Sequence, residues 1–125
     1  MTSRTGGAWR TQPAASSCEV VAPLAIGQHR DHVLTRKASA RLDAPVWHYV
    51  DFPYVVAAEC RVEDLVPDGA ERFSLDISPG GLAAWQDGFV CHRSQIQLLF
   101  SDEEEARAAI RRYSETGGGR TLFRF

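Results

Sequence analysis

The chain has 125 residues, of which 44% are hydrophobic and 24% charged, and its formal net charge is −2 at pH 7. This length predicts one domain with a single modest core, and the composition is ordinary for a globular protein. No apolar run approaches the ~18 residues that cross a bilayer, and the net charge argues against a dedicated nucleic-acid binder.

Residues 1–17 are rich in Ser, Thr, Gly and Ala and have no periodicity. We expect a flexible tail there, followed by a single domain over residues 18–125. The tail lacks the apolar centre of a secretory signal, so we expect a cytoplasmic protein. Basic residues are almost all arginine and alanine is abundant, which indicates a bacterial, high-GC genome.

The charges are unevenly distributed along the chain. Residues 1–41 hold six basic and two acidic side chains, whereas residues 42–125 hold eight basic and fourteen acidic ones. A basic arm before an acidic body can either bind an anion or fold back on the body.

Several segments have the composition of short strands. Pro23 within the β-prone segment Cys18–Ile26 predicts an edge strand, and Val46–Val50 predicts a second strand. The weakly patterned residues 27–41 suit a loop or a short helix. Alternation over Tyr54–Val62 predicts a half-buried strand with Cys60 in the core.

Short strands are predicted at residues 73–77, 82–85, 89–91 and 95–100; Pro79-Gly80 fits a type II turn, and Gln86-Asp87-Gly88 is a hairpin signal. The surest element is a helix over about residues 101–116. Ser101 and Glu104 have the spacing of a capping box, and a buried stripe recurs at helical spacing; its members are Ala106, Ala109, Ile110 and Tyr113.

Residues 121–125 have the composition of a final strand. The expected fold class is therefore α+β, with a mostly antiparallel β-sheet or small barrel, one main C-terminal helix and a final short strand. A terminal strand of this kind also leaves a homodimer open, since it can pair across a two-fold axis.

One short motif points to a ligand. The segment Asp76-Ile-Ser78-Pro-Gly-Gly81 resembles the DxSxxG signature of PilZ domains, and the upstream segment from Arg36 to Arg41 (RKASAR) resembles their arginine-rich motif inexactly. The resemblance implies a β-barrel receptor for a cyclic dinucleotide, cyclic di-GMP, with ligand contacts from Arg36, Arg41, Asp76, Ser78 and Gly81. The alternative interpretation of the segment is a strand followed by a turn.

The leading hypothesis is a small non-catalytic binding or regulatory domain, because no P-loop, GxGxxG, HExxH or GxSxG motif is present. Its ligand would be the cyclic dinucleotide or a protein partner, since the C-terminal segment faintly resembles small bacterial immunity proteins. The alternative is a small cofactor-free enzyme of the cyclase or isomerase type; its aromatic pocket would comprise Trp47, Tyr49, Tyr54 and Trp85.

Cysteine and histidine give weaker signals. Cys18, Cys60 and Cys91 form no CxxC pair, which predicts free and mostly buried thiols. His29 and His32 have HxxH spacing, but no second ligand pair has motif spacing, so we expect neither a metal site nor a cofactor. No catalytic residue is predicted.

Overall fold

The computed structural model describes residues 19–57, 61–116 and 118–125. Four short strands form one open sheet in the order β1-β2-β4-β3. The strands are β1 (Val20–Pro23), β2 (Val46–Tyr49), β3 (Glu71–Ser74) and β4 (Thr121–Arg124). The pairing β1–β2 is parallel, whereas β2–β4 and β3–β4 are antiparallel. The α+β class, the mostly antiparallel sheet and the final strand are confirmed.

Pro23 lies in β1 at one edge of the sheet, as expected for a residue that cannot donate to a central ladder. The parallel connection from β1 to β2 needs a crossover, and α1 (Arg30–Ser39) supplies it. A 3₁₀ turn, η1 (Ile26–Gln28), leads from β1 into this helix. The weakly patterned residues 27–41 are therefore mostly helical.

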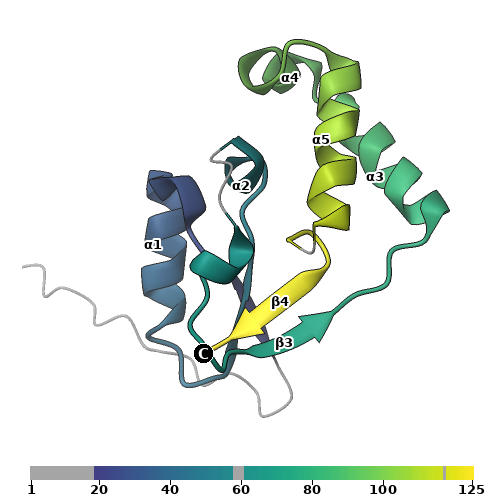
Figure 1. Ribbon diagram of the computed structural model, residues 1–125. Helices are drawn as coiled ribbons and strands as arrows, with labels where there is room; N and C mark the ends of the chain where they lie inside the picture. The colour runs from purple at the N-terminus through teal and green to yellow at the C-terminus, as the bar shows by residue number, and fades with distance from the viewer. Residues whose placement is uncertain (1–18, 58–60, 117) are drawn as a thin grey trace, which may run out of the picture.

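Three further helices lie at the right of Figure 1, away from α1 at the left. They are α3 (Pro79–Val90), α4 (Arg93–Leu99) and α5 (Glu103–Glu115), while α2 (Tyr54–Ala57) and the 3₁₀ turn η2 (Val62–Asp64) follow β2. Helix α3 packs against α5, and α2 contacts both α5 and η1.

Helix α5 forms as the sequence predicts, with Ala106, Ala109 and Ile110 fully buried and Tyr113 nearly so. Its cap is shifted by one residue. Asp102 is the N-cap and accepts from the amide N–H of Glu105 at 2.8 Å, while the Glu105 carboxylate accepts from the Ser101 amide at 2.7 Å. Acidic side chains in the first turn also favour the positive end of the helix dipole.

Four strand predictions are wrong. Residues 54–57 are helical, whereas residues 58–60 of that predicted strand, which include Cys60, lie outside the described residues. Residues 79–90 and 93–99 are α3 and α4, and Pro79-Gly80 begins a helix instead of forming a type II turn. Ser78 is the N-cap of α3 and proline occupies the first turn, where its missing N–H costs nothing.

The core lies where β2, α2 and α5 converge. Its buried members are Leu24, Ile26, Val50, Val55, Val62, Val66, Tyr113 and Phe123. The phenol of Tyr113 donates to the backbone carbonyl of Val50, so α5 is fixed to the residue that directly follows β2. Burial raises the pKa of Tyr113, with a further contribution from the Asp51 carboxylate.

Candidate functional site: a buried carboxylate, an oriented histidine and a basic cavity

Asp51 is a fully buried carboxylate at the carboxyl ends of the parallel strands β1 and β2. Its Oδ2 accepts from the backbone N–H of Ile26 at 3.0 Å, and its Oδ1 lies 2.6 Å from Nδ1 of His32. A buried charge is tolerated only where hydrogen bonds and opposite charge compensate its lost hydration. Each oxygen of this carboxylate has such a partner.

The contact with Asp51 orients the His32 ring. Because an ionised carboxylate can only accept, Nδ1 carries the hydrogen and Nε2 of a neutral ring keeps its lone pair. The His32 side chain is 28% exposed, and within the described residues nothing is hydrogen-bonded to Nε2. His32 therefore presents a basic nitrogen at the surface while its opposite nitrogen is fixed.

Two aromatic side chains lie against His32. The ring centroids of His29 and His32 are 5.1 Å apart, and Tyr54 meets His32 edge-on at 5.6 Å. The Tyr54 ring also covers Gly27, whose φ is +80° and where an added Cβ would lie 2.7 Å from the ring. Only glycine therefore fits beneath Tyr54 at this position.

The turn beside Gly27 has unusual backbone geometry. Ala25 has φ +67° and Gln28 has φ +57°, which are left-handed conformations that residues with a Cβ seldom adopt. Such conformations cost free energy and tend to occur at binding and catalytic sites. The same turn contains Ile26, whose backbone N–H donates a hydrogen bond to Asp51.

A cavity of about 300 Å³ lies between this turn and α1. Its basic side chains are Arg36 and Lys37, and its other lining residues are Ala25, Gln28, Val33 and Ala40. No acidic residue lines it, and within the described part of the chain neither Arg36 nor Lys37 is ion-paired with a carboxylate. His32 and Asp51 do not line this cavity, but His32 lies one helical turn before Arg36 on α1. We call His32, Asp51, Arg36 and Lys37 the α1 site.

Arg36 is held in place from two sides. Its Nη1 donates to the backbone carbonyl of Leu24 at 2.7 Å, and its guanidinium lies 5.9 Å from the centroid of the Phe125 ring. Phe125 in turn stacks on the buried His48 at 4.9 Å. Burial and the Arg36 charge lower the pKa of His48, so the neutral ring is favoured beside Arg36.

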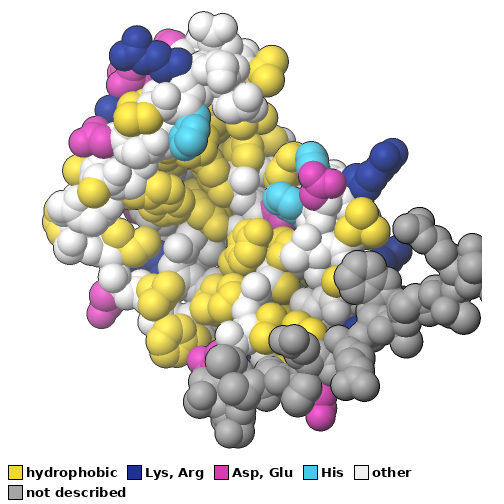
Figure 2. Space-filling model, turned by 180° about the vertical axis from the view of Figure 1, so that it is seen from behind, with side chains coloured by type: hydrophobic (Ala, Val, Ile, Leu, Met, Phe, Trp, Pro, Cys, Tyr) yellow, Lys and Arg dark blue, Asp and Glu magenta, His cyan; other side chains and the backbone are white. Residues whose placement is uncertain are grey.

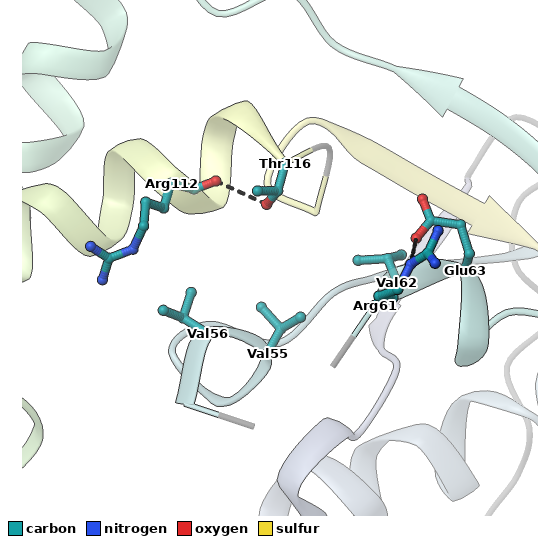
Figure 3. A pocket seen from close by; sticks show the side chains of 7 residues that line it. All are labelled: Val55, Val56, Arg61, Val62, Glu63, Arg112 and Thr116. Atoms are coloured by element: carbon teal, nitrogen blue, oxygen red, sulfur yellow. Dashed lines mark hydrogen bonds and ion pairs between the residues drawn. The ribbon is translucent and has the colours of Figure 1, made fainter. Parts of the chain in front are cut away.

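A second kind of surface lies around α2 and the α4–α5 region. One groove of about 390 Å³ has mostly apolar walls, which include Pro53, Tyr54, Leu98 and Phe100. A neighbouring pocket of about 330 Å³ lies between α2, η2 and the end of α5 (Figure 3). From behind, apolar side chains gather along a hollow between the α3–α4 side and the α1 side (Figure 2).

The predicted ligand contacts are divided between the two edges of the sheet. Arg36 belongs to the α1 site, and Arg41 is exposed just after α1, which packs on β1. Strand β3 is at the opposite edge of the sheet, three strand spacings or about 14 Å from β1, and it is followed by Asp76, Ser78 and Gly81. Ser78 Oγ accepts from the Gly81 amide at 3.0 Å as the cap of α3.

The four aromatics of the predicted pocket do not line one cavity among those described. Trp47 packs against Phe73, with the Arg124 guanidinium 4.8 Å from its ring centroid. Trp85 packs against Phe52 and Tyr113, within the helical region. Tyr54 alone lines the apolar groove, and Tyr49 is 37% exposed on β2.

Cys91 is exposed at the end of α3, contrary to the expectation of a buried thiol, and its Sγ lies 3.2 Å from the Asp87 carbonyl. Cys18 and Cys60 lie outside the described residues. Across the described ranges, no group of three or more His, Cys, Asp or Glu side chains could hold a metal ion. No helix in those ranges has the length and apolarity to span a membrane.

The pairing of His32 with Asp51 was missed from the sequence. The HxxH spacing drew attention to His32, but Asp51 lies 19 positions away in a segment without a motif. Comparison with known proteins gives no further guidance, since no family model, curated protein or solved structure matches the chain.

Proposed function

We propose that this chain is a small binding domain whose α1 site takes a small anionic ligand with a short apolar part. One observation carries the proposal: the cavity beside α1 is lined by two cations that no described carboxylate neutralises. Such a cavity attracts negative charge, and its apolar walls at Ala25, Val33 and Ala40 suit a few carbon atoms.

The two cations have different roles in this proposal. Arg36 is preorganised, because the Leu24 carbonyl and the Phe125 ring hold its guanidinium before a ligand arrives. Its remaining N–H groups can donate to a carboxylate or a phosphate. Lys37 is exposed and contributes a mobile point charge. A negatively charged ligand would therefore be bound by one fixed donor, Arg36, and one mobile donor, Lys37.

Isothermal titration calorimetry tests the proposal with three probes: inorganic phosphate, 2-oxobutyrate and cyclic di-GMP. Lys37→Ala is the informative variant, because Lys37 lines the cavity without a described structural contact. We expect it to weaken binding of at least one probe by about tenfold. Arg41→Ala removes a charge just beyond α1 that does not line the cavity, so it should change the affinity less than about twofold.

The cyclic dinucleotide remains a candidate because Arg36 carries the family resemblance and also lines the cavity. If the family resemblance describes the ligand site, Arg41→Ala and Asp76→Ala will weaken cyclic di-GMP binding as strongly as Lys37→Ala. Absence of heat with all three probes at high micromolar concentration would contradict the anion-binding proposal altogether.

A second candidate function, association with another copy of this chain, is favoured by the apolar surface on α4. Leu98 is 76% exposed and Leu99 48% exposed, and both line the apolar groove. Sedimentation velocity over a wide concentration range tests it. A dimer that Leu98→Glu dissociates would support this function, and a monomer at every concentration would exclude it.

A further inference from the structure

We infer that His32, oriented by Asp51, is a general base that removes a proton from a carbon acid whose carboxylate is held by Arg36 and Lys37. The inference rests on the proposed anion binding and adds a reaction to it. It assigns His32 as the catalytic residue and Asp51 as a positioning residue.

The two nitrogens of the His32 ring have different surroundings. Its Nδ1 is fixed 2.6 Å from a fully buried carboxylate, whereas the side chain as a whole keeps 28% of its surface open. A ring needed only to neutralise Asp51 could be buried with it. Here the carboxylate holds one tautomer and can stabilise the imidazolium that forms when Nε2 takes a proton.

His32 and Arg36 lie on the same helix. His32 and Arg36 are four residues apart on α1, so their side chains project from the same face, about 6 Å apart along the helix axis. One segment fixes both of them, because Leu24 accepts from Arg36 and Ile26 donates to Asp51. Anchor and base therefore share a rigid frame, as catalysis by positioning requires.

The described contacts of His32 limit the chemistry in which it can take part. The described ring contacts of His32 are His29 and Tyr54, and none of its described contacts is a serine, threonine or cysteine. A covalent nucleophile activated by this base is therefore absent from the described residues. Nε2 has no hydrogen-bond partner among the described residues, so this oriented nitrogen, one helical turn from Arg36, is free to exchange a proton with a bound ligand.

The reaction balances without an oxidant, a reductant or a cofactor. The Nε2 lone pair takes a proton from the carbon next to a carbonyl group, and the C–H electron pair enters the enolate. The imidazolium then returns a proton to the same carbon or to another position of the enolate, which regenerates the neutral ring. The net result is proton exchange or isomerisation of a carbonyl compound that carries a carboxylate.

Deuterium exchange tests this inference on the full chain. The probes are 2-oxobutyrate and 2-butanone in D₂O, which share the exchangeable C3 methylene and differ in the carboxylate. Proton NMR follows the loss of the C3 signal. We expect exchange of 2-oxobutyrate to be accelerated, His32→Gln to lower the rate by about a hundredfold, and His92→Gln, an exposed histidine near α4, to leave it unchanged.

Asp51→Asn tests the positioning role by separating kcat from KM. Loss of the carboxylate should lower kcat for exchange and leave KM for 2-oxobutyrate nearly unchanged, because Arg36 and Lys37 still hold the ligand while Nε2 is no longer oriented. A merely structural role would impair kcat and KM together. His32→Gln can still donate to Asp51, so a folded variant without exchange activity remains interpretable.

The outcomes separate this inference from the proposed function. If calorimetry detects 2-oxobutyrate but the wild-type chain exchanges it no faster than His32→Gln, the general base is refuted and anion binding stands. If 2-butanone exchanges as fast as 2-oxobutyrate, the anchoring role of Arg36 and Lys37 is refuted, and the inference fails as stated.

Discussion

The β1–α1–β2 region and the α3–α4–α5 region differ in their most unusual side chains. Asp51, directly after the first region, is a fully buried carboxylate, and His48 is only 8% exposed. In the second region the apolar side chain of Leu98 is 76% exposed, although Gln86 and Ser114 are buried. The buried carboxylate and the exposed leucine are both more informative than an exposed charge or a buried leucine, because each costs free energy in the isolated chain.

The comparison suggests two separate kinds of recognition. Buried polar groups fix side chains at defined positions, as they do for His32 and Arg36, and this suits a small ligand read by hydrogen bonds. Exposed apolar side chains on α4 suit a broad contact that needs area more than direction. Substitutions in the two surfaces should therefore differ in their effect on stability as the surfaces differ in composition.

The largest expected difference in the free energy of unfolding is between a buried and an exposed side chain of the helical region. Ile110→Ala deletes a fully buried side chain of α5 and should lower the free energy of unfolding by about 3 kcal/mol. Leu98→Ala should change it by less than about 0.5 kcal/mol, because that side chain is mostly in water. Urea denaturation measures both. Equal losses would show that α4 is packed in solution.

The next effect probes the buried carboxylate. Asp51→Ala leaves the Ile26 amide and the His32 ring without their acceptor, which should cost about 2 kcal/mol of unfolding free energy. Asp76→Ala, at an exposed carboxylate, is the control and should be nearly neutral. Thermal unfolding by circular dichroism compares them. A neutral Asp51→Ala would mean that the carboxylate has no structural role.

A smaller effect concerns the start of α3. Ser78→Ala removes the cap on the Gly81 amide and should cost about 1 kcal/mol. Ser78→Asp, which can cap as well, should retain the stability. If Ser78 acts only as a cap, neither variant will alter anion affinity in calorimetry. Loss of affinity in the fully folded Ser78→Asp variant would instead support a ligand role for the segment.

The smallest effect is a pH dependence from His48. Because burial and Arg36 lower its pKa below the usual 6.5, the unfolded chain takes up a proton more readily than the folded chain. Its contribution to stability is therefore complete above pH 6.5 and is lost as the pH falls below that value. His48→Phe should reduce the stability difference between about pH 7.5 and about pH 5.5, measured by urea denaturation.

The sequence predicts α5, β2, β4 and the edge position of β1 because those elements follow local rules. The buried stripe at Ala106, Ala109 and Ile110 has helical spacing, and Pro23 excludes a central strand. Local rules also explain the errors. In α4 only Ile96 is buried. Leu98 is apolar but exposed, so the apolar residues Ile96, Leu98 and Phe100 alternate as in a strand although they belong to a helix and its end.

The α3 error has a different origin. Pro79-Gly80 and Gln86-Asp87-Gly88 suggested turns, but Ser78-Pro79 is also a helix-start signal, and packing against α5 favours the helix. For the candidate site, the sequence predicts Arg36 as a ligand contact but not the contact of His32 with Asp51. That contact depends on the crossover through α1, a tertiary feature without a short-range signal.

The position of β4 has a kinetic consequence. This strand lies between β2 and β3, and its Phe123 pairs with His48 and Arg72, which lie much earlier in the chain. The parallel pair β1–β2 can form around α1 before β4 is present, but β3 can join the sheet only through β4. Closing such long loops is entropically slow, so docking of β4 is expected to limit the folding rate.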